Sequence, residues 1–308
     1  MSPKAARRLR AGYPWIYRQD VMSPPEAPSG AVVRITDASG NFIGLGFWAV
    51  HSPLALRLLT RREEKVDASF FRQRLADALE RRKRQYPGDD AYRVVHGEAD
   101  LLPGLFVDRY GSAVTVQVIS EGMAAREAEL VEALDGLLSP THIALRNDTA
   151  ARDFEGLPRT TALAKGASPA LATFHEGENV FEIDLLADSK TGSFLDQKEN
   201  HVRATAYARG RGLDTFGYHG GFALALARGC EHVLSVDQNE AATARAQANV
   251  ARNGLKNVEV RTANAFDLLR QLEAADERFD VIVVDPPAFA KRKEGLGAAE
   301  RAYKELNL

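Results

Sequence analysis

The sequence predicts an α/β protein with a β-rich front, a small α+β middle part and a back part of alternating strands and helices. Three observations support this prediction. Short β-branched runs separated by turn residues lie between residues 30 and 59. Strand and helix patterns alternate from about residue 174, as they do in βαβ units. The continuous apolar run from Phe279 to Val284 is typical of a strand buried on both faces of a parallel sheet.

The front part is predicted to span residues 1–66. Residues 31–35 and 42–48 are expected strands joined by turn residues, and the second run has glycines at positions where bulges occur. Residues 54–59 predict a further strand. We therefore expect a small β-barrel-type domain at the front of the chain.

The middle part is predicted to span residues 67–172. A helix is expected at residues 68–86, because large apolar residues recur there every four positions, at Phe71, Leu75 and Leu79. The other expected elements are strands at 94–97, 104–110, 113–119 and 142–146 and a helix at 126–138. Residues 148–172 show no clear period and predict a loop or linker.

The back part is predicted to span residues 173–308. Its expected elements are a hairpin at 179–185, helices at 197–207, 222–228, 240–253 and 266–272, and strands at 212–215, 232–236, 258–261 and 279–284. This alternation predicts a Rossmann-like parallel sheet.

Charge is unevenly distributed along the chain. Residues 1–84 contain 16 Lys/Arg and 8 Asp/Glu, a balance of +8, whereas residues 85–308 contain 24 and 34, a balance of −10. A basic front on a mildly acidic body indicates contact with a polyanion. The alternative is a solvated basic helix at residues 72–84 that binds no ligand.

Composition excludes several classes of protein. No apolar run is long enough to span a bilayer, and no apolar stretch follows the basic N-terminus as a secretory signal requires. The single cysteine, Cys230, cannot form an internal disulfide and fits a reducing compartment. The seven histidines show no metal-ligand spacing. We therefore expect a cytoplasmic protein with no membrane anchor and no metal.

The strongest candidate site is the strand–turn–helix of residues 213–222, Leu-Asp-Thr-Phe-Gly-Tyr-His-Gly-Gly-Phe. Its three glycines allow a sharp turn and a close approach of the backbone to a ligand. Asp237 ends the next strand, where Rossmann-type sites place the carboxylate that binds a ribose. A dinucleotide-binding oxidoreductase is the alternative, but the glycines lack the Gly-x-Gly-x-x-Gly spacing of that class. The looser loop suits a nucleoside with an amino-acid tail, such as S-adenosylmethionine (SAM).

A second candidate site is Asp-Pro-Pro-Ala-Phe at residues 285–289, directly after the apolar strand. Ligands of open α/β sheets bind at the carboxyl ends of strands, and the two prolines fix the backbone there. This arrangement would hold Asp285 and Phe289 against a planar base. The alternative is a rigid loop with Phe289 in the core.

A third candidate segment, residues 190–201, combines an aromatic residue with amides and charges just before the first strand of the predicted sheet. Its sequence is Lys-Thr-Gly-Ser-Phe-Leu-Asp-Gln-Lys-Glu-Asn-His. The alternative is a helix start that is capped by Ser193 or Asp196.

Taken in order, Lys-Thr-Gly-x-Phe-Leu-Asp-Gln, the glycine turn, Asp237 and Asp-Pro-Pro-x-Phe resemble the bacterial 23S ribosomal RNA (cytosine-C5)-methyltransferase family with an N-terminal PUA domain. Residues 12–16 and 52–59 resemble the opening and closing segments of that PUA domain, and residues 100–105 and 107–111 resemble the family's central domain. The resemblance covers essentially the whole chain. It implies a Rossmann-like SAM-dependent methyltransferase domain preceded by a β-rich PUA domain and a small α+β domain.

The resemblance also implies roles for single residues. The glycine turn would hold the methionine end of SAM, Asp237 its ribose and residues 263–266 its adenine, while Asp285 and Phe289 would face the target base. The implied SAM-binding residues are Phe194, Gln197, Asp214, Phe216, Gly217, Gly220, Gly221, Asp237, Asn264 and Asp285. Many relatives have Asp where Asn264 stands, although an amide can still bond the adenine edge. The PUA domain would bind structured ribosomal RNA, and no DNA partner is expected.

The implied reaction is transfer of the SAM methyl group to carbon 5 of a cytosine in ribosomal RNA. Because carbon 5 is a poor nucleophile, such enzymes first add a cysteine thiolate to carbon 6. The base must also be unstacked to reach the site. Two alternatives stay open. Methylation of an exocyclic base nitrogen is disfavoured by Ala288, which separates the prolines from Phe289. The other alternative is a non-catalytic RNA-binding protein that keeps its SAM site.

The sequence finally predicts an incomplete methyltransferase sheet. Only four strands are expected after residue 190, whereas the sheet of the resembled family has more. Residues 303–308 have the pattern of an amphipathic helix that opens without a stop signal. Cys230 precedes the second strand, away from both motifs, and is expected to be structural. We therefore expect a chain that lacks the catalytic-cysteine segment, that is inactive by itself and that leaves Phe279–Val284 as an exposed edge.

Overall fold

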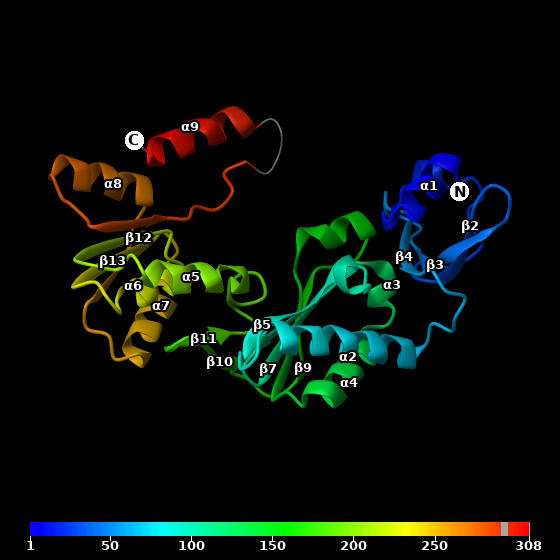
Figure 1. Ribbon diagram of the computed structural model, residues 1–308, viewed down its shortest axis with the longest axis horizontal. Coiled ribbons are helices and arrows are strands. Elements are labelled where there is room, and N and C mark those ends of the chain that lie inside the picture. The colour runs from blue at the N-terminus through cyan, green and yellow to red at the C-terminus, as the bar shows by residue number, and fades with distance from the viewer. Residues whose placement is uncertain (291–294, 308) are drawn as a thin grey trace. The chain divides into compact units, whose positions relative to one another are not determined.

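The computed structural model describes residues 1–290 and 295–307 (Figure 1). The chain forms two compact units and passes between them three times. The first unit comprises Met1–Ala172 and Asp184–Gly192, and the second comprises Thr173–Ile183 and Ser193–Leu308.

The first unit begins with a four-stranded antiparallel sheet in the order β1-β4-β3-β2. The elements are α1 (Pro3–Arg10), β1 (Trp15–Ile16), the 3-10 turn η1 (Arg18–Asp20), β2 (Val32–Thr36), β3 (Phe42–Trp48) and β4 (Leu56–Thr60). The three expected strands are confirmed to within two residues. Helix α1 is present in the structure but was not predicted from the sequence. Ser2 caps its first turn, Pro3 occupies its first position, and three apolar residues bury one of its faces.

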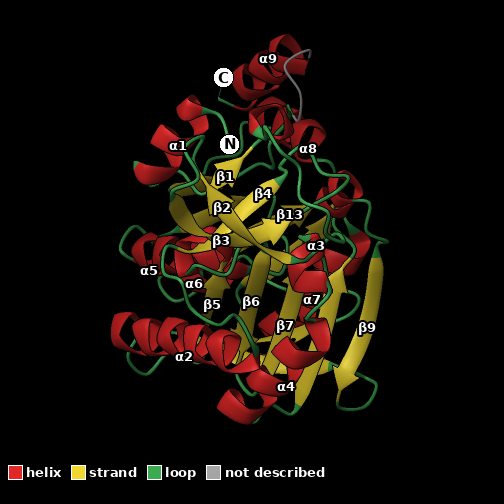
Figure 2. Cartoon of the chain, turned by 90° about the vertical axis from the view of Figure 1, so that its right-hand side faces the viewer, coloured by secondary structure: helices red, strands yellow, loops and turns green. Residues whose placement is uncertain are grey.

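The second sheet of this unit has five strands in the order β5-β6-β7-β8-β9, of which only β7 and β8 pair in parallel (Figure 2). The elements are α2 (Ala68–Gln85), β5 (Ala91–His96), η2 (Gly97–Asp100), β6 (Leu105–Tyr110), β7 (Ala113–Val118), α3 (Glu121–Ala124), α4 (Glu127–Leu138), β8 (His142–Asn147), η3 (Ala150–Glu155) and β9 (Thr160–Lys165). Helices α2 and α4 pack against each other over this sheet. The predicted stripe of α2 is confirmed, because Phe71, Leu75 and Leu79 are buried.

The prediction of a loop or linker at residues 148–172 is wrong. This segment holds the 3-10 turn η3 and the strand β9, and β10 begins at Leu171. β9 is an edge strand whose residues are mostly exposed. A strand with so little burial on either face needs no alternation of apolar and polar residues, so its sequence carries no period.

The two sheets of the first unit share one buried core. Phe47 and Leu59 of the front sheet lie in the same apolar cluster as Phe71 and Leu75 of α2. The rings of Phe47 and Phe71 stack with their centroids 6.3 Å apart. The front sheet is therefore not an independent module within this unit, because its removal would expose the core of the second sheet.

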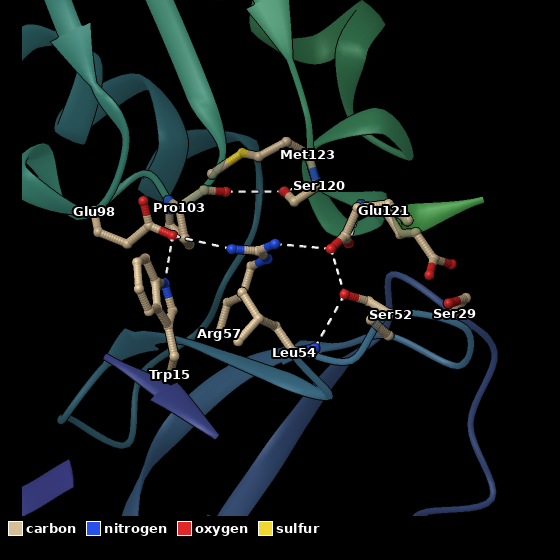
Figure 3. Close-up of polar contacts among 12 residues, drawn as sticks. Trp15, Ser29, Ser52, Leu54, Arg57, Glu98, Pro103, Ser120, Glu121 and Met123 are labelled. Carbon is tan, nitrogen blue, oxygen red and sulfur yellow. Dashed lines mark hydrogen bonds and ion pairs between the residues drawn. The ribbon is translucent and has the colours of Figure 1, made fainter. Parts of the chain in front are cut away.

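A buried charge network crosses the same junction (Figure 3). Arg57 of β4 donates to Glu155 at 2.7 Å and to Glu98 at 3.2 Å. Glu155 also accepts a hydrogen bond from the Ser52 hydroxyl at 2.5 Å, and Glu98 accepts one from the indole N–H of Trp15 at 2.7 Å. A buried arginine between two carboxylates keeps every charge paired, as burial of charge requires. Trp15 therefore has a structural partner.

The second unit is built on a parallel sheet in the order β14-β13-β12-β15. The elements after the hairpin β10 (Leu171–Glu176) and β11 (Asn179–Asp184) are η4 (Leu195–Gln197), α5 (Lys198–Thr205), β12 (Arg211–Thr215), α6 (Gly221–Leu226), β13 (His232–Asp237), α7 (Glu240–Arg252), β14 (Val258–Thr262), α8 (Ala265–Ala274), β15 (Val281–Val284) and α9 (Leu296–Leu306). The predicted alternation of strands and helices is confirmed, as is a sheet of four strands in the described part of the chain.

Two expectations near the C-terminal end of the chain need correction. In the described residues β15 is an edge strand, which confirms the expected exposed edge, and Ile282 is 52% exposed, so the expectation of an apolar run buried on both faces is wrong. The apolar run alone cannot distinguish these cases, because the fold supplies the neighbours of a strand. Residues 303–308 do not open a helix either. α9 already begins at Leu296, and Asn307 follows it in the C-cap position.

Candidate cofactor site at the carboxyl ends of the parallel strands

The candidate site lies where the strand order reverses. β12 has β13 on one side and β15 on the other, and the Thr215 hydroxyl donates to the Val283 carbonyl at 2.9 Å. Such a reversal opens a crevice outside the carboxyl ends of the strands, and ligands of open α/β sheets bind there. The loop after β12 carries the glycine turn, and the loop after β15 begins at Asp285. Two motifs that are distant in sequence therefore meet at one edge of the sheet.

The turn between β12 and α6 has a strained backbone. Phe216 and Tyr218 have φ values of 62° and 47°, in the left-handed region that bulky residues rarely adopt. At Gly217 a Cβ atom would lie 2.2 Å from the Ser235 hydroxyl, so only glycine fits. Strained residues of this kind are concentrated at functional sites. The glycine turn thus has the backbone of a loop shaped for a ligand.

Asp237 at the end of β13 holds this turn from one side. Its Oδ2 accepts the Tyr218 backbone N–H at 3.0 Å, and its Oδ1 accepts the Asn239 N–H at 2.9 Å. These bonds fix the plane of the carboxylate. A carboxylate has about four acceptor positions, so both oxygens retain capacity for ligand hydroxyls.

Asp214 lies beneath the turn, and its side chain is almost completely buried. Its Oδ2 accepts a hydrogen bond from the Ser235 hydroxyl at 3.1 Å. Burial raises the pKa of Asp214 to about 7, and the Ser235 bond only partly opposes this. Within the described residues Oδ1 accepts no hydrogen bond of regular geometry, and the nearby Ala223 backbone N–H only lowers the pKa of Asp214 further against the effect of burial. A buried acceptor without a regular hydrogen bond below the glycine turn suits a cationic group of a ligand, such as the ammonium of SAM.

Aromatic rings gather at the same edge of the sheet. The ring centroids of Phe216, Phe266 and Phe289 lie 5.8 to 6.4 Å apart, and Tyr303 of α9 lies 4.9 Å from Phe289. Asn264 is the N-cap of α8, where its side-chain oxygen accepts the Phe266 backbone N–H at 2.9 Å. Asn264 therefore positions Phe266, and the rings together form an apolar surface suited to a flat nucleobase.

The segment before α5 reaches this edge through two side chains. Phe194 packs edge-on against Tyr218, with 5.1 Å between ring centroids. Gln197 donates its side-chain N–H to Asp285 at 2.8 Å. The third sequence motif thus meets both the glycine turn and the Asp-Pro-Pro-x-Phe motif.

Helix α5 itself departs from the sequence-based alternative and adds an unexpected residue. It begins without a side-chain cap, so the reading of Ser193 or Asp196 as its cap is wrong. His201 of α5 lies with Nδ1 2.7 Å from a carboxylate oxygen of Glu176, on β10. Its ring fills the space beside Gly221, where a Cβ atom would lie 2.4 Å from it. His201 ends the third candidate segment, but no local pattern links it to Glu176 or Gly221, so its role beside the turn could not be predicted from the sequence.

Cys230 lies outside the site, packed with Leu226 and Val233 in an apolar cluster. Burial raises the pKa of its thiol, which donates to the Arg209 carbonyl at 3.4 Å. This environment is consistent with the predicted structural role. Among residues 1–290 and 295–307, no three His, Cys, Asp or Glu side chains form a group that could hold a metal ion. The same residues include no helix that is long and apolar enough to cross a membrane.

Comparison with family models and solved structures agrees with this architecture. The model for a PUA-like domain matches residues 1–61, and the model described as conserved hypothetical protein 95 matches residues 198–299. A putative methyltransferase solved in complex with SAH has a TM-score of 0.79 at 20% identity, over 95% of this chain and 77% of that chain. A putative SAM-dependent methyltransferase from Streptococcus mutans has a TM-score of 0.78 at 20% identity, over 97% and 81%. The fold is that of a Rossmann-like methyltransferase with a PUA-like domain in front.

Curated relatives identify the family. The chain is 37% identical to the ribosomal RNA large subunit methyltransferase I of Tolumonas auensis, over 98% of this chain and 79% of that protein. It is 32% identical to the protein of the same name from Alteromonas mediterranea, over 100% and 80%. The chain belongs to the ribosomal RNA large subunit methyltransferase I family.

Proposed function

We propose that the chain is a SAM-dependent methyltransferase that modifies a base of large-subunit ribosomal RNA. The observation that carries this proposal is the convergence of the glycine turn, Asp237, the buried Asp214 and the aromatic cluster at one edge of the parallel sheet. The family supports the substrate class, because the relatives are named for the RNA they methylate. The basic front part supports a polyanionic partner.

Each portion of SAM finds suitable groups at this edge. Asp237, already oriented by two backbone N–H groups, accepts the ribose hydroxyls. Phe266 and Asn264 would flank the adenine, and the glycine turn with Asp214 beneath it would receive the methionine end. When bound, SAM supplies an electrophilic methyl group. The residues of the chain would bind and orient it, and the loop after β15 would present Asp285 and Phe289 to the base.

The target base is received by the loop after β15. Asp285 is exposed there, and the bond from Gln197 orients its carboxylate. Phe289 is half-buried in the aromatic cluster and lies on the same loop. A base enters such a site only after it has left its stack, so an unpaired or flipped nucleotide is the substrate.

We further propose carbon 5 of cytosine as the methyl acceptor. This chemistry needs a thiolate that adds to carbon 6. Cys230 is the only cysteine among the 308 residues, and its thiol is buried outside the site with a raised pKa. Cys230 is therefore not the nucleophile. The absence of a suitable thiol in this sequence favours a second candidate function, methylation of an exocyclic base nitrogen, because that reaction needs no thiol.

The proposal is tested by incubating the purified chain with labelled SAM and unmodified 23S ribosomal RNA, followed by mass spectrometry of the nucleosides. 5-Methylcytidine would establish carbon 5 as the acceptor and would overturn the argument that this chain needs a cysteine thiolate for that chemistry, whereas an N-methylated base supports the second candidate. SAM binding is measured separately by calorimetry. Binding without methyl transfer agrees with a SAM site that lacks a nucleophile. Absence of SAM binding by the folded chain overturns the proposed function.

A further inference from the structure

The imidazole of His201 is enclosed on three sides inside the second unit. Its Nδ1 lies 2.7 Å from a carboxylate oxygen of Glu176 on β10. Phe222 of α6 packs edge-on against it, with 4.5 Å between the ring centroids. On the third side lies Gly221, and the three atoms nearest to a Cβ at that position all belong to the imidazole. The ring is therefore held in one orientation beside the glycine turn.

Glu176 has a fixed position relative to this turn. Its side chain is buried, and the strand that carries it pairs with β11. Asn249 of α7 accepts the backbone N–H of Glu182 on β11 at 2.9 Å and donates to the His219 carbonyl in the turn at 3.2 Å. The hairpin and the turn are thus joined through one buried side chain of the same unit.

Gly221 is required because of the imidazole. It opens α6, and its φ lies outside the left-handed region, so its backbone conformation does not demand glycine. A Cβ there would lie 2.4 Å from Cε1 and 2.5 Å from Nε2 of His201. The ring therefore excludes a side chain from the end of the turn and fixes how closely α5 approaches it.

His201 also acts on the carboxylate beneath the turn. Burial raises the pKa of Asp214 to about 7, and the Ser235 hydrogen bond and a positive charge on His201 oppose this effect. The imidazole thus lies close to the carboxylate that is expected to meet the ammonium of SAM. A change at position 201 would reach the site through Gly221 and through Asp214.

We propose that His201, oriented by Glu176, is a positioning residue for the SAM site. Its ring holds Gly221 and so sets the shape of the turn that receives the methionine end of the cofactor. All the contacts that carry this role lie inside the second unit. The inference rests on the proposed function in taking SAM as the ligand.

The test is a double-mutant cycle between positions 201 and 221 of the full chain. His201→Ala removes the ring, and the SAM Kd measured by calorimetry should rise about tenfold, which corresponds to about 1.4 kcal/mol. Gly221→Ala places a methyl group against the ring and should raise the Kd at least as much. In the double variant the methyl group occupies space that the ring has left. Its Kd should therefore stay within about twofold of that of His201→Ala.

Two further readouts separate positioning of the turn from a general loss of structure. Amide hydrogen exchange at residues 217–222, measured without ligand, should be faster in His201→Ala, because the turn has lost its support. Glu176→Gln keeps the size of the side chain and an acceptor oxygen but loses the charge. Its SAM Kd should lie between those of the wild type and His201→Ala.

His232→Ala is the matched control. His232 also lies near a glutamate, with Nε2 3.9 Å from Glu259, but it begins β13 and is thus at the opposite end of that strand from the site. Its loss should leave the SAM Kd unchanged.

A folded His201→Ala variant with the wild-type Kd, additive losses in the double variant, or an equal loss in His232→Ala overturns the inference. If His201→Ala does not fold, Glu176→Gln decides, and a wild-type Kd in that variant overturns the inference. If the wild type binds no SAM, the proposed function fails. The exchange comparison then still decides whether His201 holds the turn.

Discussion

Replacement of Asp237 tests the core of the SAM site. Asp237→Ala removes the acceptor expected to bind the ribose hydroxyls, and a hydrogen bond to a charged group contributes about 1.5–3 kcal/mol. The SAM Kd should therefore rise about 10- to 150-fold. The same variant leaves the Tyr218 and Asn239 N–H groups without their acceptor. The turn should loosen as well, which places the expected loss toward the upper end of that range.

Isothermal titration calorimetry with SAM measures this loss directly. Asp237→Asn retains one acceptor oxygen without the charge, so its affinity should lie between those of the wild type and Asp237→Ala. Glu273→Ala, an exposed substitution on α8, is the matched control and should bind as the wild type does. A folded Asp237→Ala variant with wild-type SAM affinity would refute the placement of the ribose at Asp237.

Three further outcomes are expected. Burial raises the pKa of Asp214 to about 7, so the folded chain keeps a proton that the unfolded chain loses near pH 4. The free energy of unfolding should therefore fall as pH rises from about 4 to about 7. SAM affinity should rise over the upper part of that range, and Asp214→Asn should flatten both profiles in denaturation and calorimetry; profiles identical to those of the wild type would contradict this role. Arg57→Met removes the cation that pairs with the buried Glu155 and the partly exposed Glu98 and should cost about 3–5 kcal/mol in urea denaturation, whereas Arg34→Met, from an exposed pair, should cost about 1 kcal/mol or less. Equal losses in the two variants would show that the Arg57 network is unimportant for stability. Lys4→Ala with Arg7→Ala on the exposed side of α1 should weaken binding of ribosomal RNA fragments and lower the salt slope by roughly 0.7–0.9 per lost phosphate contact, while Lys256→Ala in the second unit should not. An unchanged salt slope would remove α1 from the RNA-binding surface.

Local patterns predicted the elements that have a period of their own. α2 and the alternating strands and helices of the second unit follow from the spacing of apolar residues, because each buries one face or both. β9 and α1 were missed. β9 is an exposed edge strand without alternation, and α1 is eight residues long with only three buried positions. The apolar run of β15 was predicted as a strand, and its place at an edge of the described sheet agrees with the count of four strands, whereas its burial on both faces was wrongly inferred from the run alone.

The residues of the candidate site also separate into those that local patterns predict and those that only the assembled fold brings together. The glycine turn, Asp237 and Asp285 could be chosen because each follows a predicted strand, and parallel strands end at one edge of the sheet. The pairing of Gln197 with Asp285 joins residues 88 positions apart, and that of His201 with Glu176 joins residues 25 apart. Such contacts are products of the assembled fold and leave no mark on local spacing.

The left-handed backbone at Phe216 and Tyr218 has a consequence for how this family can change over time. A bulky residue in that conformation costs of order 1–3 kcal/mol, and glycine would adopt it freely. A substitution that relieves this strain would therefore raise thermal stability but would remove an aromatic side chain from the loop at the same position. A protein in which these aromatic rings had no role could gain stability by substitution of Phe216 or Tyr218 with glycine. Glycine at position 216 would thus relieve strain in the turn while removing the Phe216 ring from the aromatic cluster.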